Sequence, residues 1–261
     1  MPELPEVEAA ARFLHSQISG RTLLAVTWLH RSLLRNAAAD VDTLIGHRVA
    51  RVVRVAKWQE IVFDDESVLV VHFRMTGDWA VTHRPDPPGH ARAHFVFSGA
   101  RHVWLVDPRV LSRITVRRSG DVDPTSHRIG PDALDPALDA PALRAQFASR
   151  RAPIKQVLLD QSVIAGIGNI YAAEALWHAR INPWAPAQRL TLARVRRLLD
   201  GIRWTLALAL DEAGRHRYGT ATGRLAVYDR EGQSCRRCGA PVARTTQGQR
   251  STYWCRRCQR S

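Results

Sequence analysis

The sequence contains almost no lysine, although it is strongly basic. Lys57 and Lys155 are its two lysines, whereas lysine and arginine together number 38 and exceed the 24 acidic residues by 14 charges. Arginine stays protonated near neutral pH, but a desolvated lysine can lose its proton, so both lysines are candidates for positions that require an ammonium group. A codon bias toward arginine explains the scarcity equally well.

Long apolar runs and a secretory signal are also missing. The most apolar run, residues 204–210, ends at Asp211 and Glu212 and falls well short of the ~20 residues that cross a bilayer. The N-terminus, MPELPEVEAA, is acidic and lacks the basic and apolar regions of a signal peptide. We therefore expect no membrane partner and a cytoplasmic location.

The composition is that of a folded protein with a polyanionic partner. Apolar residues make up 45% and charged residues 24% of the chain, which excludes a disordered chain and a disulfide-stapled miniprotein. The net charge of +14 favours nucleic acid, because each arginine or lysine placed on a phosphate releases counterions. A basic bias of the whole proteome is the alternative.

Hydrophobic spacing predicts a helix followed by an antiparallel β-sandwich or barrel. Residues 3–19 place Val7, Ala11, Leu14 and Ile18 on one helical face. Short β-rich runs separated by turns then extend to about residue 117. The expected strands are 23–29, 49–55, 61–63, 68–73, 94–97, 102–106 and 112–116.

The second half of the chain is predicted to be helical. Residues 119–141 are rich in Asp, Pro and Gly and are expected to form a linker. The expected helices are 142–148, 154–161, 169–179 and 191–213, the last with an apolar stripe at alternating spacings of three and four residues.

All four cysteines lie near the C-terminus in two Cys-x2-Cys pairs. Cys235 and Cys238 are separated by sixteen residues from Cys255 and Cys258, the spacing of a structural four-cysteine zinc site on a hairpin with its turn near Gln247-Gly248. Disulfides are the alternative. Seven arginines on this ribbon favour a nucleic-acid contact: Arg236, Arg237, Arg244, Arg250, Arg256, Arg257 and Arg260.

A glycine-rich break lies between two apolar helices. Residues 165–168 (AGIG) interrupt the helical pattern, which restarts at Asn169. Gly166, Gly168 and Asn169 place free backbone N–H groups at a helix N-terminus, where a phosphate can bind. A plain helical hairpin is the alternative.

The N-terminus offers a nucleophile. Removal of the initiator methionine would expose the secondary amine of Pro2 beside Glu3 and Glu6. An α-amino group has a pKa of ~8, so part of it is neutral near pH 7 and can attack a carbonyl carbon, with the carboxylates as proton shuttles. Ordinary helix capping explains the same residues.

Together, motifs along the whole chain resemble the formamidopyrimidine-DNA glycosylase family, which includes endonuclease VIII. The motifs are MPELPEVE, Lys57, HFRMTG at 72–77, DPR at 107–109, IKQVLLDQ and GIGNIYAAEAL within 154–176, VYDREGQSC at 227–235 and QRSTYWCRRCQ at 249–259. The resemblance implies an enzyme that flips an oxidised base out of DNA, cuts its glycosidic bond and nicks the backbone.

The resemblance also implies residue roles. Pro2 matches the nucleophile, Glu3 the acid that helps to open the sugar, and Glu6 a support for the amine. Lys57 matches the proton donor of β-elimination and Arg250 the phosphate-binding residue of δ-elimination. The implied DNA contacts are His72, His90, Arg109, Arg150, Lys155 and Asn169, and Met75, Arg109 and Leu111 match the residues that fill the space left by the flipped base.

Three departures from the family pattern concern the choice of lesion. Leu111 replaces the usual Phe and stacks poorly on the orphaned base. Residues 214–226 are shorter than the usual lesion-capping loop and do not match it. The segment WQEI after Lys57 replaces a small apolar run and is expected to place Gln59 and Glu60 near the site.

We therefore predict an α+β protein with three parts: a catalytic β-sandwich with an N-terminal helix (1–130), a DNA-binding helical part with a helix-two-turn-helix (131–223) and a zinc-finger hairpin (224–261). The first hypothesis is a monomeric glycosylase and AP lyase for oxidised purines in double-stranded DNA, with one structural zinc ion. The alternatives are an endonuclease VIII-like specificity for oxidised pyrimidines or another modified base, and a non-catalytic zinc-ribbon DNA-binding protein.

Overall fold

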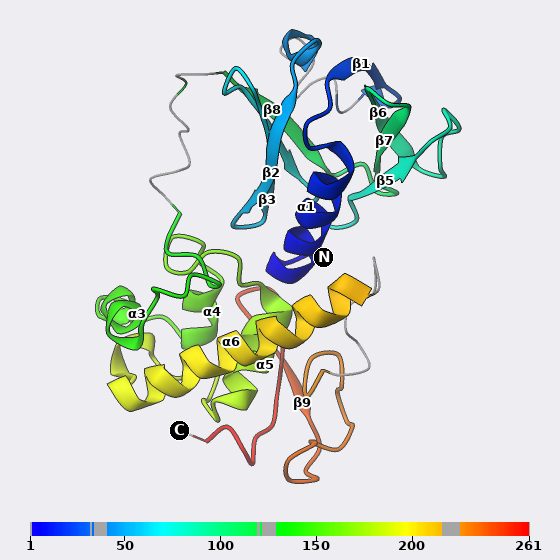
Figure 1. Cartoon of the computed structure of the whole chain (residues 1–261). Helices are drawn as coiled ribbons and strands as arrows, with labels where there is room; N and C mark the ends of the chain where they lie inside the picture. The colour runs from blue at the N-terminus through cyan, green and yellow to red at the C-terminus, as the bar shows by residue number, and fades with distance from the viewer. Residues whose placement is uncertain are drawn as a thin grey trace. The chain divides into compact units, whose positions relative to one another are not determined.

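The computed structural model describes residues 2–31, 33, 41–118, 121, 129–215 and 225–260 (Figure 1). It divides into two compact units, residues 1–124 (unit 1) and 125–261 (unit 2). Among the described residues, no helix is long and apolar enough to cross a membrane. Residues 216–224, most of the short segment singled out in the sequence, lie outside the described part.

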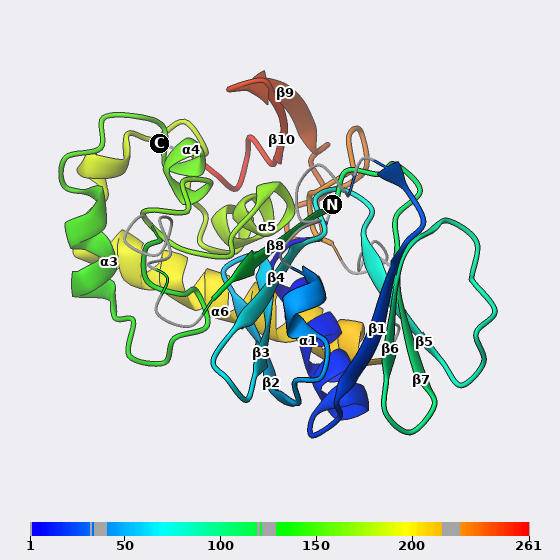
Figure 2. The same cartoon turned by 90° about the horizontal axis from the view of Figure 1, so that it is seen from above.

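Unit 1 combines the N-terminal helix α1 (Leu4–Ile18) with two antiparallel sheets (Figure 2). The first sheet has the order β1 (Leu23–Trp28), β6 (Ala91–Phe97), β7 (Arg101–Val106) and β5 (Asp78–Thr82). The second has the order β2 (Val49–Val55), β3 (Trp58–Phe63), β4 (Val68–His72) and β8 (Arg113–Arg117), and the short helix η1 (Asp42–Leu44) precedes it along the chain.

One hydrophobic core holds α1 and both sheets together. Leu14 and Ile18 of α1 are fully buried in the same cluster as Phe63 and Leu69 of one sheet and Phe95 of the other. Burial of this kind stabilises the fold in proportion to the apolar area removed from water. The helical spacing of the apolar residues of α1 therefore fixes how the N-terminus is held.

Unit 2 contains the remaining helices and a β-hairpin. The helices are α3 (Ala140–Phe147), α4 (Ile154–Leu158), α5 (Asn169–His178), η3 (Ala187–Arg189) and α6 (Leu192–Arg215). Strands β9 (Ala243–Gln247) and β10 (Arg250–Trp254) form the hairpin. α6 packs along α5 and β10 against α5, and Trp177 of α5 shares a small core with Val227, Val242 and Tyr253.

The structure confirms the α+β class, and three of its differences from the predicted elements have a clear physical reason. β5 was not predicted, because only two of its residues, Trp79 and Val81, are apolar side chains that pack in the core. β3 begins earlier than expected, because Gln59 is buried against Trp79 rather than exposed to solvent. Part of the expected linker is packed, since the backbone of residues 130–133 bonds to that of Gln161 and Ala165.

Leu14→Ala should destabilise unit 1 by about 3 kcal/mol, because a fully buried leucine leaves a cavity when it is truncated. Leu24→Ala is the matched control, since Leu24 is 51% exposed. Chemical denaturation of the full chain measures both variants. Equal losses in the two would contradict the core described above.

Candidate functional site

The N-terminus is fixed by a reciprocal capping box. The backbone N–H of Glu3 donates to Glu6 Oε2 over 2.9 Å, and the Glu3 carboxylate accepts from the backbone N–H of Glu6. Glu3 is 1% exposed and Pro2 is half-buried. The start of α1 thus holds two carboxylates and the Pro2 nitrogen in one short segment, where the helix dipole favours negative charge.

Lys57 lies in the tight turn between β2 and β3, and α1 anchors that turn. Val55 pairs with Trp58, so the turn consists of Ala56, in the left-handed region at φ 53°, and Lys57. The Arg54 Nε donates to Glu8 of α1 over 2.7 Å, and its Nη1 donates to the carbonyl of Ala56 over 3.0 Å. This nearly buried arginine joins the Lys57 turn to the helix that follows Pro2 and Glu3.

His72 is a neutral imidazole in a positive environment. Burial, together with the charges of Arg74, Lys57 and Arg113, lowers the pKa of His72 to about 4. Its Nδ1 accepts a hydrogen bond from the backbone N–H of Arg74 over 2.9 Å, so the proton of the neutral ring is on Nε2. His72 can therefore donate one hydrogen bond to a phosphate oxygen without carrying a charge.

A buried carboxylate joins the loops that carry the expected space-filling residues. Asp107 is fully buried and accepts hydrogen bonds from the hydroxyl groups of Thr76 and Ser112. It also accepts from the backbone N–H groups of Arg109, Leu111 and Ser112, over 3.2, 2.7 and 2.8 Å. Burial alone would raise the pKa of Asp107, but the bonds from Thr76 and Ser112 hold it below its usual range.

The three expected space-filling side chains project from these two loops. Met75, Arg109 and Leu111 are all exposed, Met75 to 38% and Leu111 to 40%. The loops approach so closely that a Cβ at Gly77 would meet the Ser112 hydroxyl and lie 2.8 Å from the Phe73 Cα. The structure thus places the apolar pair and Arg109 on loops that Asp107 connects.

The backbone of His90 is hydrogen-bonded to the backbone of Asp107. Its carbonyl accepts the Asp107 N–H over 3.0 Å, while Arg92 Nε donates to the Asp107 carbonyl over 2.7 Å. The His90 side chain is exposed. In contrast, Gln59 and Glu60 do not extend the site: Gln59 accepts from the Trp79 indole and Glu60 pairs with Arg117.

In unit 2, Lys155 and Asn169 join α4 and α5 to the hairpin. The Lys155 Nζ donates to Asn169 Oδ1 (2.6 Å), Thr252 Oγ1 (2.8 Å) and the Ser251 carbonyl (3.2 Å). Asn169 Nδ2 also donates to the Ser251 carbonyl, over 3.0 Å. Because Lys155 is 1% exposed and its three N–H donors have acceptors, a direct phosphate contact by Lys155 would require one of these bonds to break.

The connection between α4 and α5 is held by Gln161. Its side chain donates to the carbonyls of Leu159 and Ile167 and accepts from the N–H of Gly166. Arg150, expected to contact DNA, pairs with Asp160 of the same connection over 3.0 Å. The backbone that leads into the N-terminus of α5 is therefore preorganised.

Arg250 lies next to the hairpin turn, which has the conformation that the hairpin requires. Gly248 and Gln249 form a two-residue turn with φ 54° and 60°, as in a type I′ turn. Arg250 is exposed, and its guanidinium has no partner among the described residues. It is available for a phosphate.

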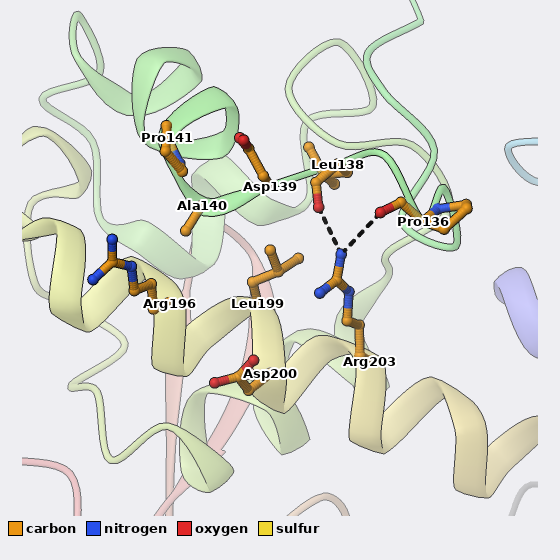
Figure 3. Close-up of a pocket in the computed structure, with 9 residues that line it drawn as sticks. All are labelled: Pro136, Leu138, Asp139, Ala140, Pro141, Arg196, Leu199, Asp200 and Arg203. Carbon is orange, nitrogen blue, oxygen red and sulfur yellow. Dashed lines mark hydrogen bonds between the residues drawn. The ribbon is translucent and has the colours of Figure 1, made fainter.

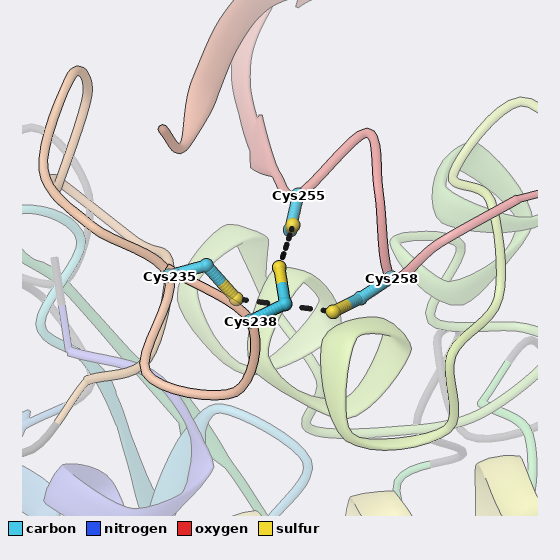
Figure 4. A group of neighbouring side chains, drawn as sticks. All are labelled: Cys235, Cys238, Cys255 and Cys258. Carbon is cyan, nitrogen blue, oxygen red and sulfur yellow. Dashed lines mark hydrogen bonds between the residues drawn. The ribbon is translucent and has the colours of Figure 1, made fainter. Parts of the chain in front are cut away.

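The four cysteines form one cluster (Figure 4). All four Sγ atoms lie within 4.8 Å of one another, and the 238–255 and 235–258 pairs are 3.5 and 4.0 Å apart. Four sulfur ligands of a tetrahedral zinc ion are about 3.8 Å apart, so the donor set and its spacing fit Zn²⁺. No disulfide links the four residues.

The environment of the sulfurs also fits a cation. Burial alone would raise the pKa of Cys235, but the backbone N–H of Arg237 and the Trp177 indole lower it to about 6. Burial and the adjacent sulfur atoms raise the pKa of Cys258 to about 12. A metal ion is therefore needed to ionise all four thiols near pH 7.

Glu174 is a second buried carboxylate that the sequence analysis did not single out. It accepts the backbone N–H groups of Ala226, Val227 and Tyr228 over 2.7–2.9 Å. Burial raises its pKa despite these bonds. Glu174 therefore joins the middle of α5 to the segment that leads into the zinc ribbon.

Family models cover most of the chain. The formamidopyrimidine-DNA glycosylase N-terminal domain matches residues 1–114, the H2TH domain of the same enzyme matches 129–218, and a zinc finger found in this enzyme and in IleRS matches 232–260. The chain belongs to the formamidopyrimidine-DNA glycosylase family. It is accordingly a DNA glycosylase with AP lyase activity that binds one zinc ion, and not a non-catalytic DNA-binding protein.

Curated relatives and solved structures match over the full length. The formamidopyrimidine-DNA glycosylases of Roseiflexus sp. and Chloroflexus aurantiacus are 38% and 36% identical and are covered to 100% and 98%. The MutM (FPG) structure from Thermus thermophilus is 36% identical, with a TM-score of 0.86 and coverage of 99% and 98% of the two chains. The Lactococcus lactis enzyme with Fapy-dG DNA is 27% identical, with a TM-score of 0.91 and coverage of 99% and 100%.

Removal of zinc should abolish DNA binding by this glycosylase, because the cysteine cluster closes the small core that the hairpin shares with α5. Chelation, metal analysis and a DNA-binding titration measure the effect, and re-addition of zinc is the control. Unchanged affinity after confirmed loss of the metal would contradict the structural role of the cluster.

Proposed function

We propose that this glycosylase removes oxidised purines, formamidopyrimidines first and 8-oxoguanine second, and then cleaves the strand by β,δ-elimination. The main support for this proposal is the N-terminal segment, in which Pro2 directly precedes the buried Glu3 of a capping box. The family's solved structures include one bound to Fapy-dG DNA and one bound to carbocyclic 8-oxo-G DNA.

The proposed chemistry begins at the Pro2 nitrogen. Its lone pair attacks C1′ of the damaged nucleotide, the glycosidic bond breaks with its electrons going to the base, and Glu3 supplies the proton that opens the sugar ring. The resulting iminium acidifies the C2′ proton. Loss of that proton expels the 3′ phosphate, and a second elimination expels the 5′ phosphate.

The remaining site residues hold the DNA in this proposal. Lys57 donates a proton during β-elimination, and the exposed Arg250 binds the phosphate that leaves in δ-elimination. Met75, Arg109 and Leu111 fill the space of the extruded base, a wedge-insertion strategy. His72, His90, Arg150 and Asn169 contact the backbone, whereas Lys155 acts by holding Asn169 against the hairpin.

Met75 and Arg109 favour the purine branch, whereas Leu111 and the short segment at 214–226 leave the oxidised-pyrimidine alternative open. Because the relatives are bacterial enzymes, we propose that the protein works on nucleoid DNA in the cytoplasm.

Borohydride should trap the protein covalently on duplexes that carry formamidopyrimidine, 8-oxoguanine or an abasic site, because reduction converts the Pro2 iminium to a stable amine. Pro2→Gly should lose trapping, whereas Pro5→Ala, in the first turn of α1, is the control and should retain it. A panel that also includes thymine glycol and dihydrouracil, opposite each base, measures specificity. Trapping confined to the pyrimidine lesions would select the endonuclease VIII-like alternative, and undiminished trapping of Pro2→Gly would exclude the nucleophile.

Asp107→Asn should lower excision from duplex DNA by about tenfold or more, because an amide nitrogen would face backbone N–H donors and release the loops of Met75 and Leu111. Cleavage of single-stranded DNA with a preformed abasic site should change little, since no opposite base has to be displaced. Asp64→Asn, at an exposed aspartate of the same unit, is the control. Equal loss on both substrates would indicate a general folding defect.

A further inference from the structure

We propose that the cysteine end of the zinc ribbon carries a second phosphate-binding site, for a DNA segment other than the one held at Pro2. The site is a pocket of about 310 Å³ lined by Arg180, Arg237, Cys238, Arg257, Cys258 and Arg260. It is called the knuckle pocket below. The proposal rests on the proposed function in one respect: it assumes that a lesion-bearing DNA segment is bound at Pro2.

The charge of the knuckle pocket is not balanced by its own residues. Four thiolates with one Zn²⁺ carry −2 and the four lining arginines carry +4, which leaves a surplus of two positive charges. No carboxylate lines the pocket. Within the described part of the chain, the side chains of Arg180, Arg257 and Arg260 have no hydrogen bond or ion pair. Arginines gathered without acceptors are suited to bind phosphate, which their planar groups contact bidentately.

One arginine is already held in place and fixes the wall of the pocket. Arg237 donates to the carbonyls of Trp177 and His178 over 2.9 and 3.3 Å, and its guanidinium lies 4.1 Å from the centroid of the Trp177 ring. The contact with the ring holds the planar group against the C-terminus of α5. One of the four arginines of the pocket, Arg237, is therefore preorganised.

A second pocket of the same unit shows that arginine alone does not produce this imbalance. The pocket between α3 and α6, of about 370 Å³, contains Arg196 and Arg203, but Asp139 and Asp200 lie in it as well (Figure 3). Arg203 also donates to the Leu138 carbonyl over 2.7 Å. Its charges balance, so this pocket offers no comparable site for an anion.

Nucleic acid fits the knuckle pocket better than an acidic peptide does. No apolar side chain other than cysteine lines it, whereas peptide sites depend on apolar anchors. Arginines that contact phosphate oxygens are typical of nucleic-acid surfaces, where they fix the position of the backbone.

The knuckle pocket is separated from the expected lesion-phosphate contacts. Asn169 begins α5 and His178 ends it, so the ten-residue helix spans about 15 Å between them. Arg180 follows the far end. The two basic regions of unit 2 therefore lie at opposite ends of one helix, so a phosphate in the knuckle pocket does not occupy the Asn169 end of α5.

The test uses zinc-loaded full-length protein trapped by borohydride on a short abasic duplex, so that the Pro2 site is filled. A labelled undamaged duplex is then titrated onto the trapped complex at several salt concentrations. The pocket variant is Arg180→Gln with Arg260→Gln. The matched control is Arg189→Gln with Arg196→Gln, which removes two exposed arginines of the same unit. Zinc content is measured in each.

The wild-type complex should bind the second duplex. The pocket variant should bind it about tenfold more weakly, with a slope of log K against log salt that is smaller by about 1.8, because two phosphate contacts are lost. The control variant should match the wild type.

Any of the following results would overturn the proposal: no binding of the second duplex, equal losses in both double variants, or tighter binding of poly-glutamate than of DNA, which would indicate an acidic protein partner. Binding of inorganic pyrophosphate without DNA would show that free phosphates are the ligand and would also reject the DNA source. Failure of trapping would count against the proposed role of Pro2 rather than against the knuckle pocket. The Pro2 site would then be filled by saturation with unlabelled abasic duplex, and the titration would be repeated on that complex.

Discussion

The buried carboxylate of Asp107 is the interaction on which two loops of the first unit depend, those that carry Met75 and Leu111. Neither loop has regular secondary structure, so their backbone N–H groups need acceptors from elsewhere. Asp107 supplies two oxygen atoms to three backbone and two hydroxyl donors. One ionised side chain thus fixes the positions from which Met75, Arg109 and Leu111 project, and its charge strengthens each bond.

One of the two lysines occupies a position that arginine cannot fill. Lys155 donates to three acceptors that surround a single nitrogen, a tetrahedral arrangement that a planar guanidinium cannot satisfy in a space that is 1% exposed. Lys57 occupies a two-residue turn whose backbone Arg54 already holds. An arginine therefore anchors the backbone of the turn that contains Lys57.

Local patterns predicted the parts of the molecule whose determinants are close together in the sequence. The spacing of the cysteines predicted their cluster, and the periodicity of residues 3–19 predicted α1 to within one residue at each end. Long-range bonds were beyond such reasoning. Nothing near Asp107 in the sequence indicates that Thr76 completes its environment. Glu60 was expected near the site because it closely follows Lys57, but it pairs with Arg117, which is 57 residues away. The proposed role of Arg250 came from the resemblance to the family, whereas the chemistry of an N-terminal amine already made Pro2 a candidate nucleophile.

The zinc ribbon and α5 act as one structural element in the second unit. Glu174 ties the middle of α5 to residues 226–228, Lys155 and Asn169 tie its beginning to β10, and Arg237 ties its end to the cysteine cluster. These bonds fix the hairpin tip, with Arg250, and the cysteine end, with its arginines, relative to the same helix axis. The zinc ion has only a structural role in the hairpin. Because it fixes the hairpin on α5, it also sets the distance between the basic hairpin tip and the basic cysteine end. The arginines of the ribbon are thus divided between its two ends, with Arg250 at the hairpin tip and Arg237, Arg257 and Arg260 at the cysteine end.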